Sequence, residues 1–187
     1  GLGWGAIAIK AARVQIGSSD RFLLVGATEG PLTIRVAEID PTTGTATQVA
    51  QAPGVGSSLS LYIATVNGRI FIFSADEARS GFPVDPLRGL QIYEFIPSPP
   101  ALVLRRSILG NFTQVVVKGW PGSPFPAIFA HRLGVGFQSF IDIYDTNFLM
   151  TPTAPPRRAS SLPHIGAPQG FRGYAVEAVV TRNGSVV

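Results

Sequence analysis

Paired carboxylates are the first residues in this sequence whose type and spacing suggest chemistry. Asp142 and Asp145 close one apolar run, and Glu38 and Asp40 close an earlier run in the same way. Two carboxylates can act as acid and base in glycoside hydrolysis, and they can also ligate calcium. On a strand, however, residues three apart point to opposite faces. We therefore expect Asp142 and Asp145 to be solvent-side strand residues and turn initiators.

Other groups that carry catalysis are few. The two histidines are His131 and His164, and neither has a second metal ligand at a short spacing. We expect His131 to end a strand and His164 to be solvated. The sequence has no cysteine and no Gly-x-Ser-x-Gly elbow, and the glycines before Ser57 lack the lysine of a phosphate-binding loop. The sequence therefore predicts no catalytic residue, no metal site and no cofactor.

Tryptophan and arginine side chains are the remaining candidates for binding. Trp4 and Trp120 stand in glycine-rich and proline-rich segments, where a side chain is either displayed on a loop or caps the core. A displayed tryptophan can stack on a sugar or anchor a protein interface. The 13 arginines, against two lysines, are scattered, with adjacent pairs only at Arg105-Arg106 and Arg157-Arg158. Arginine is the cation that protein interfaces favour, so we take these pairs and the tryptophans as candidate interaction residues.

Composition limits the class of protein. Charged residues make up 14% of the 187 residues and apolar residues 45%, with a net charge of +4. No apolar run reaches the roughly 18 residues of a membrane span. The basic residues form no dense patch, so nucleic acid is a secondary partner at most. A surface poor in charge favours contacts with other proteins, although a large core would give the same composition.

The elements that must position these residues are predicted to be strands. Runs rich in β-branched and aromatic residues recur between Gly, Pro, Asn and Ser, and no long window keeps a helical apolar face. The sequence therefore predicts an all-β protein of antiparallel sheets, like a β-sandwich or jelly roll. The clearest predicted strands are Ala6–Lys10, Arg21–Ala27, Thr33–Asp40, Leu59–Val66, Arg69–Ala75, Leu90–Ile96, Ala101–Arg105, Gln114–Lys118, Ala127–Arg132, Ser139–Asp145 and Tyr174–Thr181.

Three turns can be predicted directly. Asn67-Gly68 and Asn183-Gly184 each lie between two apolar runs, and both are typical of the type I′ turn, in which both central residues need positive φ. Asp40–Gly44 is a third turn, since Pro41 presets φ and Gly44 tolerates the left-handed conformation. These turns predict meander connections between antiparallel strands.

An internal repeat of about 50 residues suggests an alternative architecture. Arg21–Ala27 is similar to Arg69–Ala75, and each is followed by a second strand of related character. Ala127–Arg132 with Ser139–Asp145 forms a third pair. Units of this length resemble the four-stranded blade of a propeller. They have a faint similarity to kelch-type repeats, but the paired glycines of those repeats are missing here. The resemblance implies a partial propeller of about 3.5 blade-like units.

Five prolines set the segment 151–170 apart from the rest of the chain. We expect an all-β domain over 1–150, a proline-rich arm with few backbone hydrogen bonds over 151–170, and a terminal hairpin over 171–187. The hairpin would add strands to its own sheet or to that of a neighbour.

Together these features predict a non-enzymatic structural protein: a coat, shell, protrusion or scaffold subunit whose partners are copies of itself or neighbouring chains. Low charge, arginine over lysine, the arm and the terminal hairpin all favour this function. Two alternatives stay open. One is a β-domain that binds a carbohydrate or a protein through loop aromatics, and the other is a fragment of a larger propeller protein. A location outside the cell or at the surface of a particle would suit the structural function.

Overall fold

The structure is a computed structural model, and it describes residues 5–29, 32–54, 57–77, 89–120, 122–134, 139–151, 153–156 and 158–163. Strands dominate this part of the chain, and its single helical element is a short 3-10 helix, η2 (Thr146–Leu149). The predicted all-β class is confirmed. No helix among the described residues has the length and apolar character needed to cross a membrane.

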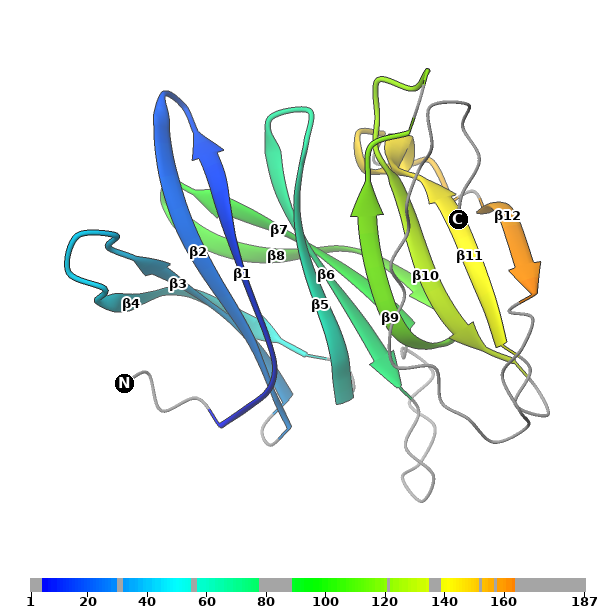
Figure 1. The fold of residues 1–187 in the computed structure, drawn as a ribbon, viewed down its shortest axis with the longest axis horizontal. Helices are drawn as coiled ribbons and strands as arrows, with labels where there is room; N and C mark the ends of the chain where they lie inside the picture. The colour runs from blue at the N-terminus through cyan, green and yellow to red at the C-terminus, as the bar shows by residue number, and fades with distance from the viewer. Residues whose placement is uncertain are drawn as a thin grey trace.

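The described residues contain twelve strands in three antiparallel sheets of four strands each, which Figure 1 shows beside one another in chain order. The first sheet contains β1 (Ala6–Ile16), β2 (Ser19–Glu29), β3 (Leu32–Ile39) and β4 (Ala46–Pro53). The second contains β5 (Ser57–Val66), β6 (Arg69–Glu77), β7 (Gly89–Pro97) and β8 (Pro100–Leu109). The third contains β9 (Asn111–Lys118), β10 (Ala127–Leu133), β11 (Ser139–Asp145) and β12 (Arg158–Pro163).

Each sheet is a meander in which every strand pairs with the next one in the sequence. The strand order has no crossover of the jelly-roll kind among the described strands. It is the order of a propeller blade, and the sheets stack face to face without closing a barrel. The repeat has a structural basis, since Arg21–Ala27, Arg69–Ala75 and Ala127–Arg132 lie in the second strands of the three sheets.

Two predicted turns are confirmed. Asn67 (φ 50°) and Gly68 (φ 73°) close the β5–β6 hairpin, with Val66 opposite Arg69. At the β3–β4 connection, the Asp40 carbonyl accepts a hydrogen bond from Gly44 N at 2.8 Å, and Gly44 has φ 69°. Asn183-Gly184 lies outside the described residues, as do Tyr174–Thr181 and the terminal hairpin.

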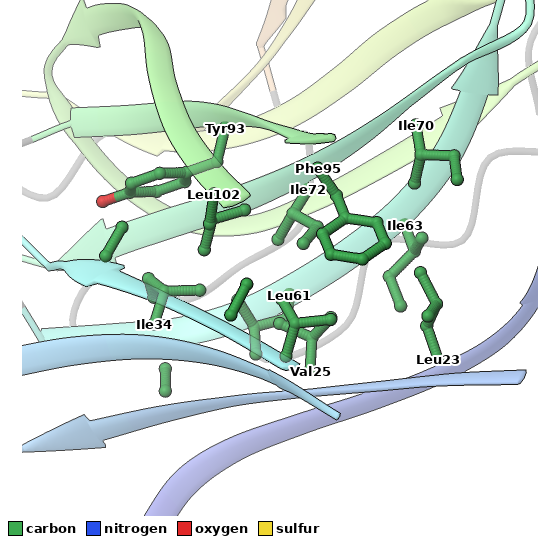
Figure 2. Close-up of a cluster of buried hydrophobic side chains, with 14 of the residues drawn as sticks. Leu23, Val25, Ile34, Leu61, Ile63, Ile70, Ile72, Tyr93, Phe95 and Leu102 are labelled. Atoms are coloured by element: carbon green, nitrogen blue, oxygen red, sulfur yellow. The ribbon is translucent and has the colours of Figure 1, made fainter. Parts of the chain in front are cut away.

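The first core fills the space between the first and second sheets. Alternate residues of β2, such as Leu23 and Val25, are fully buried against the apolar face of β5, β6 and β7. Figure 2 shows the facing side chains, with Phe95 and Ile72 of the second sheet pointing toward Leu23 and Val25 of the first. This alternation is what a strand with one buried face requires.

A second core joins the second sheet to the third. Phe71 and Phe73 of β6 point away from the first core and pack with Phe112 and Ile128 of the third sheet. The second sheet is therefore covered on both faces, and every residue of β7 from Gly89 to Phe95 is buried. Burial on both faces accounts for the continuous apolar run Ile70–Phe73 in β6.

The segment predicted as an arm contains a strand. Arg158–Pro163 forms β12 and pairs with β11 from Phe140 to Tyr144. The prediction of few backbone hydrogen bonds is therefore wrong for these six residues. The five residues before Pro163 all have an N–H donor, and the sequence places proline only at the end of this edge strand, where it is tolerated. The sequence analysis also did not predict strand β4 (Ala46–Pro53) in the first sheet.

Candidate interaction sites

The outer face of the first sheet is an apolar surface that no other described sheet covers. Because Leu23 and Val25 of β2 point into the first core, Phe22 and Leu24 point outward. Register places this outward set together, with Leu24 opposite Ala11 and Ala37 and with Phe22 opposite Ile39. The outer face comprises Ile7, Ile9, Ala11, Phe22, Leu24 and Ile39, while Ala37 on the same side of the sheet is fully buried. Its exposed fractions reach 40% at Ile7, 62% at Ile9 and 36% at Phe22.

Polar groups border this face. Arg13 pairs with Asp20 beyond the β1–β2 turn, and the ion pair holds the pKa of Asp20 below its ordinary value. On the β4 side, Gln48 donates a hydrogen bond to Gln51 at 3.2 Å. Arg35, on β3 opposite Gly26, interrupts the apolar residues of the sheet, and its Nε is buried without a hydrogen-bond partner among the described residues. An apolar centre with a polar border is the usual anatomy of a protein interface.

The carboxylates Glu38 and Asp40 line a hollow of about 560 Å³ together with Asp20 and Arg21. Each carboxylate already has a partner. Glu38 accepts a hydrogen bond from Arg21 at 2.8 Å, and Asp40 accepts one from Thr42 N at 2.8 Å. This backbone hydrogen bond lowers the pKa of Asp40. No group of three or more potential ligands among the described residues is arranged to hold a metal ion.

Arg105 belongs to an ion network around Glu94 of β7. Arg69 donates Nε to Glu94 Oε1 at 2.7 Å and Nη2 to Oε2 at 2.6 Å, and Arg105 donates Nε to Oε2 at 2.7 Å. These guanidinium groups, that of Arg69 first, hold the pKa of Glu94 below its ordinary value. The bidentate geometry requires arginine, because lysine has no planar fork.

Arg69 and Arg106 fasten the second sheet to the connection between β11 and β12. Arg106 Nη2 donates to the Thr151 carbonyl at 3.0 Å, and Arg69 Nη1 reaches the Leu149 carbonyl at 3.4 Å. Arg105 and Arg106 were predicted as interaction residues. Their hydrogen bonds are intramolecular: those of Arg105 stabilise the second sheet, and that of Arg106 to Thr151 joins this sheet to the chain after β11.

Asp142 is the hub of a second ion network, and its exposed fraction is 0%. Arg132 donates Nε to Asp142 Oδ2 at 2.5 Å, which raises the pKa of Arg132. Arg158, on β12, lies 3.6 Å from the other carboxylate oxygen. The prediction of a solvent-side Asp142 is therefore wrong, because two strand neighbours supply the counter-charges that make its burial tolerable. Asp145 is a turn initiator as predicted, since it accepts a hydrogen bond from Asn147 N at 2.8 Å.

The remaining predicted residues take structural places where the structure describes them. Trp120 stacks on Phe129, with ring centroids 5.9 Å apart, and so covers a small apolar cluster on the third sheet. His131 is buried within β10, and its Nδ1 lies 2.5 Å from the Thr113 hydroxyl. Trp4, Arg157 and His164 lie outside the described residues.

Sequence reasoning missed Glu94 and did not predict the burial of Asp142, although a signal was present for both. Glu94 stands between Tyr93 and Phe95, and Asp142 stands between Ile141 and Ile143. A single carboxylate inside an apolar strand run predicts a buried ion pair, since an unpaired charge is too costly to bury. The arginine partners could not be assigned, because they come from other strands.

Comparison with known proteins gives no relative: no protein-family model matches the sequence, and no curated protein matches it significantly. The geometry of the described surfaces therefore has to support the function by itself.

Proposed function

We propose that this chain is a non-enzymatic assembly subunit that binds a second copy of itself through the outer face of its first sheet. The observation that carries the proposal is the cluster of exposed Ile7, Ile9 and Phe22 on a sheet whose opposite face is already buried. Isolated exposed apolar residues are ordinary, whereas a contiguous apolar face marks an interaction site.

Continuity with the internal interfaces favours another β-sheet as the occupant. The first sheet packs on the second, and the second on the third, in both cases through alternating apolar residues of face-to-face sheets. The outer face repeats this pattern on β1 and β2 at the open end of the stack (Figure 1). A sheet from a second copy would extend the same packing by one layer.

The size of the face suits a symmetric dimer. The whole outer surface of the sheet, with the polar border on β4 included, spans four strands of about 9 residues, and at roughly 3.3 Å per residue and about 4.8 Å spacing its area is about 600 Å². A face-to-face dimer would then bury about 1,200 Å² in total, near the lower end of stable interfaces. Because both copies offer the same patch, a two-fold axis closes the assembly without open-ended growth.

The test is the oligomeric state of the full chain by light scattering at micromolar concentration. We expect a dimer for the wild type and a monomer for Ile9→Lys, which places a charge at the most exposed of the three large apolar residues of the contact. Leu109→Lys is the matched control, because Leu109 is 64% exposed but lies at the end of β8, away from the outer face. It should stay dimeric. A monodisperse wild-type monomer, or an Ile9→Lys protein that still dimerises, would contradict the proposal.

A second function is favoured by the blade-like meanders: the chain would be part of a larger propeller-like protein, in which a further sheet covers the outer face. Light scattering of the wild-type chain, alone and with a further four-stranded sheet added, separates self-association from membership of a larger protein. A monomeric chain whose outer face takes up a further four-stranded sheet supplied in trans would support the larger protein.

A further inference from the structure

A hollow of about 590 Å³ lies at one end of the third sheet. It is bordered by the β8–β9 turn on one side and by β10, β11 and the start of β12 on the other, at the right of Figure 1. We call it the arginine hollow. It is lined by Leu109, Gly110, Asn111, Arg132, Leu133, Gly134, Asp142, Tyr144 and Arg158. Its volume falls within the range of small-molecule sites.

The charged groups of the arginine hollow are held in fixed positions. Arg132 contacts Asp142 through both Nε and Nη2, at 2.5 and 3.4 Å, and its guanidinium lies 4.8 Å from the Phe140 ring centre. The Tyr144 hydroxyl donates to Asp142 at 3.4 Å. An arginine that is fixed by a buried carboxylate and an aromatic ring loses little conformational freedom when it binds a ligand.

Arg132 and Arg158 differ in how closely they pair with Asp142. Asp142 neutralises Arg132 through two hydrogen bonds, whereas Arg158 approaches it only to 3.6 Å, beyond hydrogen-bond distance. Half of the Arg158 side chain is exposed, and it makes no hydrogen bond to the described residues. The charged residues that line the hollow thus sum to one positive charge. A cation is disfavoured there, and an anion is favoured.

We infer that the arginine hollow binds the oxyanion group of a small molecule, a carboxylate or a phosphate. Arg158 supplies the bidentate fork, and Asp142 holds Arg132 beside it as a second positive group. Planar or tetrahedral oxyanions match the guanidinium fork, and such charge-assisted pairs are among the stronger hydrogen bonds. The site lies on the third sheet, away from the outer face of the first sheet, and is independent of the proposed self-association.

The experiment is a calorimetric titration of the full chain with inorganic phosphate and, separately, with succinate. We expect at least one of them to bind, and Arg158→Gln to weaken that binding about tenfold or more. Arg158→Lys should recover only part of the affinity, because it restores the charge without the fork. Tighter binding of phosphate would indicate a phosphorylated ligand, and tighter binding of succinate a carboxylic acid; either supports the site.

Arg21→Gln is the matched control, since Arg21 is an equally exposed arginine that pairs with Glu38 and lines the other hollow. It should leave the affinity unchanged. No heat of binding from either anion at about 10 mM, well above the range of specific small-ligand sites, would overturn the inference. So would an equal loss in Arg158→Gln and Arg21→Gln, which would indicate attraction by net charge alone. Circular dichroism of each variant verifies that the fold is retained.

Discussion

Replacing Glu94 by glutamine tests how much the ion network that joins β6, β7 and β8 stabilises the folded protein. Glutamine has nearly the same size as glutamate, so packing changes little. The substitution removes the only negative charge in contact with both Arg69 and Arg105 among the described residues. It also puts an amide N–H₂ group where one oxygen accepts hydrogen bonds, so one guanidinium donor loses its acceptor.

The magnitude follows from burial. The Glu94 side chain is 10% exposed, while those of Arg69 and Arg105 are 38% and 40% exposed. Breaking a fully buried ion pair costs about 3–5 kcal/mol, and a surface pair contributes about 1 kcal/mol or less. Because water reaches both arginines, we expect a loss of about 2 kcal/mol, between these limits. Glu38→Gln breaks the exposed pair with Arg21 and should cost less than about 1 kcal/mol.

Urea denaturation at two pH values is the assay. The pKa of Glu94 is lowered in the folded protein, so its ionised form stabilises the fold above the ordinary glutamate pKa near 4.5. That stability is lost as the pH falls through the lowered value. The difference between wild type and Glu94→Gln should therefore be full at pH 7 and shrink below about pH 4. Equal losses for Glu94→Gln and Glu38→Gln, or a difference that persists in acid, would refute the reasoning.

Two further predictions concern a turn and a tyrosine. Gly68→Val should destabilise the protein by about 1 kcal/mol or more, because valine resists the positive φ of this position; the space is open, so the cost is conformational. Gly119→Val, where φ is ordinary and no atom crowds the new Cβ, is the control in the same urea experiment and should have a smaller effect. Burial, helped by the charge of Asp142, raises the pKa of Tyr144 to about 12. Neutral Tyr144 thus stabilises the fold below pH 10, and this contribution is lost as the pH rises toward 12. In a spectrophotometric titration, Tyr144→Phe should remove an absorbance step near pH 12, and removal of a step near pH 10 would contradict the assignment.

Local signals in the sequence were enough to predict most of the fold. The β5–β6 hairpin follows from one dipeptide between two apolar runs, because only a few residues adopt positive φ at both turn positions. Strand β4 (Ala46–Pro53) escaped detection because it lacks the β-branched and aromatic density of the other strands. Its alanines, Ala50 and Ala52, are buried only because the second sheet packs against them, which is a tertiary effect.

The candidate sites were harder to predict than the strands. Arg158 was singled out as an interaction residue, but its neighbours were not, because β12 and β10 lie on opposite sides of β11 and join their charges only at Asp142. Likewise the outer face depends on register, which places Phe22 opposite Ile39 across two strands. Spacing along one strand carries no information on either arrangement.

The meander order has a consequence for how this chain folds. Every hydrogen-bonded pair of described strands joins strands that follow each other in the sequence, so each sheet closes its ladders over short stretches of chain. Closing short loops costs little entropy, and topologies of this kind fold faster than those with distant pairings. Among the described residues, side-chain packing and a few hydrogen bonds couple one sheet to the next. The molecule therefore resembles a one-dimensional array, in which a unit of about 50 residues can be added or lost by gene duplication or deletion while the hydrogen bonds of its neighbours stay intact.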